Sequence, residues 1–262
     1  MATVLLILLI ATVTAASVVA MAVARRRAPD GGYIGDSPAG GAVINTVGTG
    51  FAVLLAFVIF IAFGGYQNAR REAGVEAVAV RVMVETANLL AAADRDAVQR
   101  ALACYADGVV GEEWASQNDG RESPRVGDAL EALEAAMGAA TVGAGKQTVA
   151  FEQLLEEERA RADGRRGRLA EATPLVPFLA WMLLLVAGGF AIWLVVLLAD
   201  RAQRPLWQLA GVAGVTATVL SGLVLIWALD KPFADRGTKI EPTRMEAVID
   251  FMAARGIRAE GC

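Results

Sequence analysis

Four long apolar segments dominate the pattern of hydrophobic and polar positions along this chain. They are Ala2–Ala24, Ala42–Tyr66, Thr173–Ala199 and Leu206–Leu229, and none of them contains Asp, Glu, Lys or Arg. Each is close to the ~20 residues that a helix needs to cross the hydrocarbon core of a bilayer. A helix of a soluble protein keeps one polar face toward water, which these segments lack. The pattern therefore predicts four transmembrane helices.

The polar region between the second and third spans shows helical periodicity, with apolar residues three and four positions apart and no period-two alternation. The first stripe continues the second span and comprises Val75, Val78, Ala79, Val82, Thr86, Leu89 and Leu90. The second comprises Val98, Ala101, Leu102, Tyr105 and Val109, with Asp94 as its N-cap and Gly108 and Gly111 breaking it. A third helix begins at Ser123-Pro124 and carries Leu130, Leu133 and Met137, and a fourth covers 147–162 with Phe151, Leu154 and Leu155.

These patterns divide the chain into four parts. Residues 1–66 hold the first two spans and a Gly/Pro-rich connector at 28–41, and residues 67–172 form a helical extramembrane domain. Residues 173–229 form a hairpin of spans three and four, followed at 230–262 by a polar tail with a short helix at 243–255. The predicted fold class is all-α, a polytopic membrane protein whose helical extramembrane domain lies between spans two and three.

Composition narrows the range of functions. The chain of 262 residues is 56% apolar, has a formal net charge of -4, and presents no broad basic stretch, which argues against nucleic acid as a partner. It has no histidine, the residue that most often serves as general base or zinc ligand. Of its two cysteines, we expect Cys104 to be a small buried apolar residue on a helix and Cys262 a free thiol, with no disulfide between them.

The acidic clusters do not form a recognisable catalytic set. Neighbouring carboxylates such as Glu112 and Glu113, or those of 156–158, point to different faces of one helix. No nucleophile and base accompany them. We therefore expect no enzyme activity, no catalytic residues, no metal ligands and no cofactor.

A cluster of arginines precedes the third span: Arg159, Arg161, Arg165, Arg166 and Arg168. They are candidates for contacts with anions or acidic lipid headgroups. The alternative is a basic boundary that orients the span. Basic residues near span ends are more numerous on the side of 67–172, whereas Arg25, Arg26 and Arg27 after the first span favour the reverse orientation. On the total count we predict that 67–172 is cytoplasmic.

The second span and its continuation carry the most specific motif, GTGFAVLLAFVIFIAFGGYQNARREAGVEA at 48–77. One face is small (Gly48, Ala52 and Ala56) and another is aromatic (Phe57, Phe60 and Phe63). Together with EEW at 112–114, TPLVPF at 173–178 and ALDKPF at 228–233, it resembles the bestrophin-like membrane proteins of bacteria, a family distantly similar to the bestrophin ion channels.

This resemblance implies a pentamer in the bacterial inner membrane, with a central pore for inorganic ions lined by the second span. It would place Ala52, Ala56, Phe57 and Phe60 at a narrow neck, where an apolar constriction can gate ions by dewetting. Phenylalanines in a span also commonly face lipid or pack between helices, which remains an alternative.

Two further points bear on function. Directly after the fourth span, residues 230–245 contain only the acids Asp230, Asp235 and Glu241, so the calcium clasp of animal bestrophins is not expected. The second hypothesis for the whole chain is a structural or accessory membrane protein whose acidic helical domain binds protein partners without transport.

Overall fold

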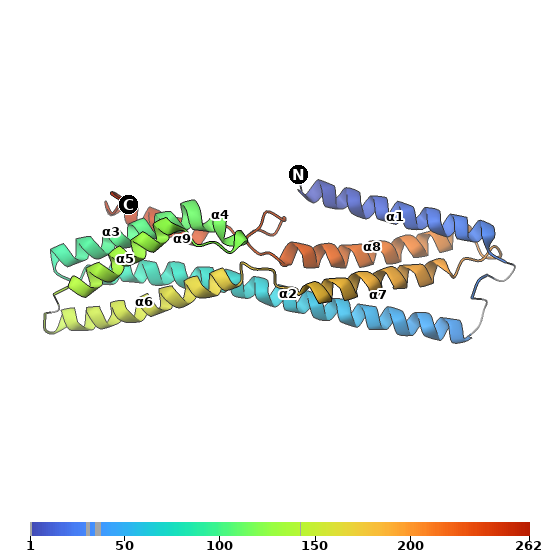
Figure 1. Cartoon of the computed structure of the whole chain (residues 1–262), viewed down its shortest axis with the longest axis horizontal. Helices are drawn as coiled ribbons and strands as arrows, with labels where there is room; N and C mark the ends of the chain where they lie inside the picture. The colour runs from blue at the N-terminus through green and yellow to red at the C-terminus, as the bar shows by residue number, and fades with distance from the viewer. Residues whose placement is uncertain (1, 30–31, 35–37, 142) are drawn as a thin grey trace. The chain divides into compact units, whose positions relative to one another are not determined.

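The computed structural model describes residues 2–29, 32–34, 38–141 and 143–262, and within these ranges every regular element is a helix (Figure 1). The elements are α1 (Ala2–Arg27), α2 (Pro38–Ala87), α3 (Ala92–Gly108), the π-helix η1 (Val109–Glu113), α4 (Trp114–Ser116), the 3-10 helix η2 (Gln117–Asp119), α5 (Pro124–Ala139), α6 (Lys146–Ala170), α7 (Phe178–Val196), α8 (Pro205–Leu229) and α9 (Thr243–Ala253). The all-α prediction is confirmed. Helices α1, α2, α7 and α8 are long and apolar enough to cross a membrane, as the four apolar segments predict.

The chain folds into two compact units. The first, unit 1, comprises Met1–Gly64, Pro174–Asp230 and Asp235–Gly237. The second, unit 2, comprises Gly65–Thr173, Lys231–Ala234 and Thr238–Cys262. The 50-residue helix α2 contributes to both. The predicted connector at 28–41 lies partly outside the described residues.

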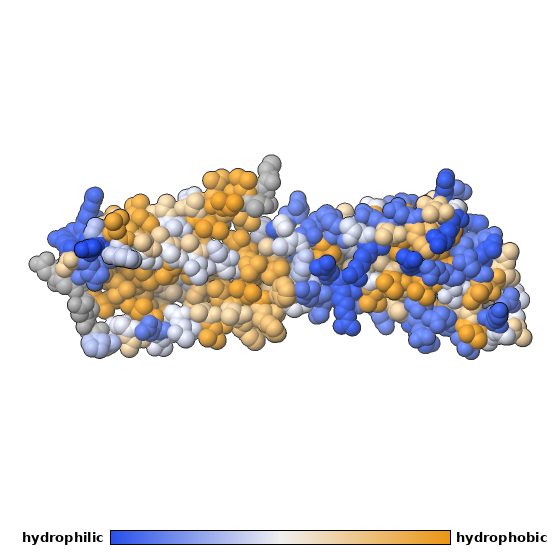
Figure 2. All heavy atoms as spheres, turned by 180° about the vertical axis from the view of Figure 1, so that it is seen from behind, coloured by the Kyte–Doolittle hydropathy of each residue, from blue (hydrophilic) through white to orange (hydrophobic). Residues whose placement is uncertain are grey.

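Unit 1 is a bundle of the four apolar helices, in which α8 contacts α1 and α7 (Figure 1). Glycines allow α2 to approach its neighbours closely, because small residues bring membrane helices together. A Cβ added to Gly222 of α8 would lie 2.7 Å from Cδ2 of Leu55, and one added to Gly188 of α7 would lie 3.2 Å from the Phe51 ring. Hydrophobic side chains cover most of the visible surface of these helices in Figure 2.

Unit 2 has a conventional buried core under a mostly hydrophilic surface (Figure 2). Helix α3 packs on α5 and α9, and the predicted stripe of α3 is confirmed, since Val98, Leu102 and Tyr105 are all fully buried. Trp114 meets Phe233 edge to face, with ring centroids 5.4 Å apart. The indole of Trp114 also donates to the carbonyl of Ile240 at 3.0 Å, which fixes Ile240 on this core.

The stripe predicted for the second half of α2 is confirmed only in part, since Ala79 and Leu90 are buried but the rest of the buried face lies on other positions. Val78 and Leu89 are more than half exposed, whereas Ala73, Ala77, Val80, Met83, Val84 and Ala87 are buried. The buried face is richer in alanine because α6 lies against it at close range. A Cβ added to Gly164 of α6 would be 2.7 Å from the backbone nitrogen of Glu76. Helix α6 does not end near 162 as predicted but continues through Gly164 to Ala170.

Helix α3 ends at Gly108 as predicted, but neither Gly108 nor Gly111 ends the helical path. The chain continues through the π-helix Val109–Glu113 and into α4, and it turns only at Gly120, whose φ is 68°. A π-helical turn inserts one extra residue per turn and is often found at functional sites. Here it carries Glu112 and Glu113 onto different faces.

The capping predictions are partly confirmed. Ser123 is the N-cap of α5 and Pro124 its first residue, but the Ser123 hydroxyl donates to Glu112 Oε2 at 2.8 Å instead of capping the helix. Asp94 is not a cap, since Ala91 occupies that position and Asp94 Oδ2 accepts the Thr141 amide at 3.1 Å. Helix α9 forms where a short helix was predicted in the tail.

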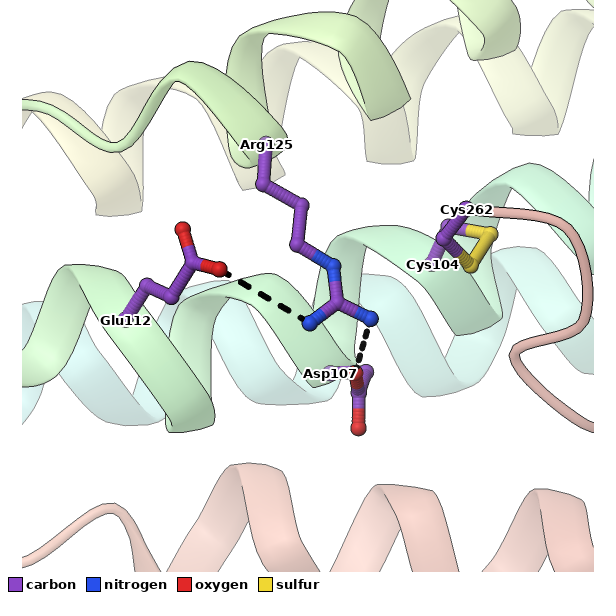
Figure 3. Close-up of a disulfide and its surroundings, with 5 residues drawn as sticks. All are labelled: Cys104, Asp107, Glu112, Arg125 and Cys262. Carbon is purple, nitrogen blue, oxygen red and sulfur yellow. Dashed lines mark hydrogen bonds and ion pairs between the residues drawn. A yellow bond between two sulfur atoms is a disulfide. The ribbon is translucent and has the colours of Figure 1, made fainter.

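The prediction of two unpaired cysteines is wrong. Cys104 and Cys262 form a disulfide with their Cα atoms 5.6 Å apart (Figure 3), within the usual range for such bonds. The two residues are separated by 158 positions in sequence, so no local spacing motif announces the bond. Cys104 is buried on α3 as expected, and the fold of unit 2 brings the chain terminus to it.

Candidate functional site

Helix α2 presents two opposite faces in unit 1. Phe51, Val58 and Ala62 are buried at 7%, 5% and 0% exposure, whereas Phe57 and Phe60 are 61% and 75% exposed. With about 100° between successive residues of an α-helix, Phe60 lies on the side opposite Phe51 and Ala62. The buried face packs on α7 and α8 through the glycine contacts. The opposite face, which we call the outer face of α2, has no comparable packing.

The four residues predicted to form a neck lie on this outer side of α2. Ala52 and Ala56 are exposed, like Phe57 and Phe60. The structure thus brings the four together along two turns of one helix. Their role as a neck stays a prediction.

Unit 2 contains a second candidate site, a buried network of charged side chains at the junction of α2, α3, η1 and α6. At its centre the guanidinium of Arg168 donates to both carboxylate oxygens of Glu76, at 2.5 Å from Nε and 3.0 Å from Nη2. It also donates to Glu113 Oε1 at 2.6 Å and to Gln117 Oε1 at 2.5 Å. Arg168, Glu76 and Glu113 are all fully buried. We refer to Glu76, Tyr105, Glu113, Gln117, Arg161, Arg165 and Arg168 as the buried charge network.

Two arginines neutralise Glu113. Arg165 pairs with it and also with the exposed Glu122 at 3.0 Å, while Arg168 approaches from the interior. Burial raises the pKa of the Glu113 carboxyl, but the hydrogen bonds and charges of Arg165 and Arg168 outweigh burial and hold that pKa below its usual value. Glu113 is therefore ionised in the fold.

Tyr105 closes the network on the α3 side. Its hydroxyl donates to Glu76 Oε1 at 2.6 Å, and burial together with the negative charge of Glu76 raises the pKa of Tyr105 well above its usual value. Arg161 stacks over the Tyr105 ring with its guanidinium carbon 4.8 Å from the centroid. Arg161 also pairs with Glu158 on its own helix. The phenol thus remains protonated and serves as a donor.

The charged groups of this network pair with one another and join the helices that carry them. Its acids are paired with permanent cations, and among the described residues no group of three or more metal-ligating side chains is found. Arginine suits this position because its fork satisfies two carboxylates and an amide at once. The network therefore holds α6 and η1 against the continuation of α2.

The arginine cluster predicted from the sequence divides into two groups. Arg161, Arg165 and Arg168 belong to the buried charge network, whereas Arg166 and Arg159 are exposed. Arg166 pairs with Asp163 at the surface. The network partners Glu76, Tyr105 and Gln117 were missed because sequence distance hides their contacts, as with the 92 positions between Glu76 and Arg168. The one signal of these contacts in the sequence was a charged residue, Glu76, on the alanine-rich face of α2.

The fold and these two sites define an all-helical membrane protein with four candidate spans and a helical unit built on the continuation of the second. The family model of the Bestrophin-like domain matches residues 10–244, and the chain belongs to this family. The identification as bestrophin-like made from the motif at 48–77 is thereby confirmed.

Solved structures share this fold. One is a variant of a bacterial bestrophin homologue from Klebsiella pneumoniae, with a TM-score of 0.72 and 15% identity over 93% of this chain and 99% of the other. A second variant from Klebsiella pneumoniae has a TM-score of 0.70 and 15% identity over 94% and 99%. A structure described as a membrane protein with one substitution has a TM-score of 0.71 and 16% identity over 94% and 98%. No curated protein matches the sequence.

Proposed function

We propose that several copies of this chain form a ring in the bilayer and that the outer face of α2 lines an ion path along its axis. In this proposal Ala52, Ala56, Phe57 and Phe60 form an apolar neck. Five copies are proposed from the resemblance to bestrophins. Membership of the Bestrophin-like family supports the assignment.

The observation that carries the proposal is the opposition of the two faces of α2. The buried face of α2 packs inside the bundle, with Ala62 at 0% exposure and Phe51 at 7%. Phe60 on the outer face is 75% exposed. A helix with one face committed to its own bundle can offer only the other face to an axis. That face is apolar, so it would restrict hydrated ions by dewetting rather than bind them.

Ion flux through liposomes reconstituted with the full chain tests the proposal. Phe60→Ala widens an apolar neck, so we expect faster flux than in the wild type. The matched control is Phe178→Ala on α7, because Phe178 is 79% exposed and also aromatic. If it faces lipid, its truncation leaves flux unchanged.

Two results would contradict the proposal. Flux absent from the wild type and from Phe60→Ala would remove the ion path and leave the accessory protein hypothesis. Equal effects of Phe60→Ala and Phe178→Ala would show a general effect on packing in the bilayer. Native gels of all three proteins verify that the assembly is intact.

We also propose that contacts of the arginine cluster with anions or acidic headgroups rest on Arg159. It is exposed, and no carboxylate of the described residues pairs with it within ion-pair distance. The guanidiniums of Arg161, Arg165 and Arg168 are already occupied by carboxylates. Binding to vesicles of acidic lipid should weaken in Arg159→Gln and stay unchanged in Arg166→Gln, because Arg166 is also exposed but paired with Asp163.

A further inference from the structure

The disulfide secures a segment that little else holds. Residues 258–262 are exposed, and Glu260 makes a local hydrogen bond to the carbonyl of Arg258 at 3.0 Å. Cys262 nevertheless meets Cys104 on α3, beside Arg125 and its partner Asp107 (Figure 3). The terminal residues and the alanines of α3 and α5 line a groove of about 480 Å³. The covalent bond is therefore the principal tether of the terminus to α3.

A structural disulfide carries information about the compartment. Disulfides form and persist in the bacterial periplasm and at cell surfaces, and they are rare in the reducing cytosol. Each thiol loses a proton and an electron when the bond forms. A thiol–disulfide oxidoreductase takes up both as its own disulfide becomes a dithiol. In bacteria this oxidation takes place in the periplasm, whereas the cytosolic enzymes of this class keep thiols reduced.

The arginines of unit 1 give an independent indication. Arg25 at the end of α1 donates to the carbonyl of Asp200 at 2.5 Å, to Gln208 Oε1 at 2.6 Å and to the carbonyl of Gln203 at 3.0 Å. Arg201 in turn donates to the carbonyl of Arg25 at 3.1 Å. These bonds join the end of α1 to the turn between α7 and α8. The two short connections are thus at the same end of unit 1.

This end of unit 1, which we call the basic end, carries Arg25, Arg26, Arg27, Arg201 and Arg204. Short loops rich in arginine stay in the cytoplasm. In a long extramembrane region, only charges within about 15–20 residues of a span influence orientation. The arginines just before span three therefore favour the opposite side, and the disulfide decides between the two charge patterns.

We infer that the basic end of unit 1 is cytoplasmic and that unit 2, with the Cys104–Cys262 disulfide, lies on the outer side of the cytoplasmic membrane. This orientation is the reverse of the one favoured by the total count of basic residues. It follows from four spans and does not depend on ion conduction. The basic residues of the tail, among them Lys239 and Arg244, then lie outside.

Labelling of single cysteines in intact cells with a membrane-impermeant maleimide tests the orientation. The native cysteines are paired and silent, so probes are introduced into the wild-type chain as Glu131→Cys on α5 and Ala202→Cys in the α7–α8 turn. Both positions are exposed. We expect Glu131→Cys to be labelled in intact cells and Ala202→Cys only after permeabilisation. The reverse pattern, or equal labelling of both in intact cells, would overturn the inference.

The wild-type chain provides a second measurement without any substitution. Cells are quenched in acid and alkylated before and after reduction. We expect Cys104 and Cys262 to react only after reduction, and to react directly in a host that lacks its extracytoplasmic thiol oxidase. Free thiols in the normal host would contradict the location of unit 2 outside the cytoplasm. A disulfide that persists without the oxidase would make the bond a product of air oxidation.

Discussion

Arg168 and Glu76, 92 residues apart, form a bidentate ion pair in which both side chains are fully inaccessible to solvent. The pair joins α6 to the continuation of the second span. Removing two charges from water is costly, so such a pair adds little net stability compared with apolar residues, but breaking it leaves an uncompensated charge. The integrity of unit 2 therefore depends on both partners being present.

Truncation of Arg168 should destabilise unit 2 severely. Arg168→Ala leaves Glu76 and Glu113 buried without their shared cation, and we expect a loss of about 3–5 kcal/mol. Arg166→Ala is the matched control, because that arginine and its partner are 75% and 68% exposed, and a surface pair contributes within about 1 kcal/mol. Urea unfolding of the detergent-solubilised chain measures both. Similar urea midpoints for the two variants would show that the buried charge network does not stabilise unit 2.

Acidification should weaken unit 2 through Glu113. Its pKa in the folded state lies below the ordinary value, so its contribution is fully present above about pH 4.3 and is lost as the pH falls through the folded pKa. Melting curves between pH 7 and pH 3 should show a smaller loss of stability in Glu113→Gln than in the wild type. Glu134→Gln, at an exposed position of α5, should follow the wild type. An equal loss of stability with falling pH in all three proteins would contradict the role of Glu113.

Gly164 should resist substitution by alanine although it lies within a helix. Alanine ordinarily stabilises a helix interior by roughly 0.5–1 kcal/mol relative to glycine, and we expect that gain for Gly127→Ala on α5, whose Cβ would meet nothing within 4 Å. At Gly164 the new Cβ would lie 2.7 Å from the backbone of α2. Overpacking should cost about 1–3 kcal/mol. Stabilisation by both substitutions in pulse proteolysis would show that α6 and α2 are not in this contact.

Loss of the disulfide should destabilise unit 2 without unfolding it. A bond that closes a long loop contributes about 2–4 kcal/mol, so Cys262→Ser should unfold at lower urea than the wild type. Reductant should bring the wild type to the level of Cys262→Ser and leave the variant unchanged. A reductant effect of equal size on both proteins would mean that the stabilisation does not come from this bond.

Local patterns were sufficient to predict the spans and most helices. The spans are identified by apolar length alone, and the stripe of Val98, Leu102 and Tyr105 places α3 because its residues pack in one layer. In the second half of α2 the same reasoning placed only Ala79 and Leu90 correctly on the buried face. There Val78 is exposed, and the buried residues next to Gly164 of α6 are the small Ala73 and Ala77.

Contacts distant in sequence could not be predicted in this way. From the sequence alone, Arg168 is interpreted as a basic residue at a membrane boundary. Only the fold shows that Glu76 and Glu113 lie next to it. The Cys104–Cys262 bond likewise joins two positions with no shared motif. For the outer face of α2, the motif at 48–77 indicated the helix, and the structure adds that Phe57 and Phe60 are on the side away from the bundle.

The mass of the assembly, measured by native mass spectrometry from mild detergent, tests the proposed ring most directly. An axial path along the outer face of α2 requires several copies. We expect a complex near five times the chain mass of 27.4 kDa, retained in Phe60→Ala and Phe178→Ala. A monomer or dimer under the same conditions would leave no axis for Phe60 to face and would contradict the proposed ion path.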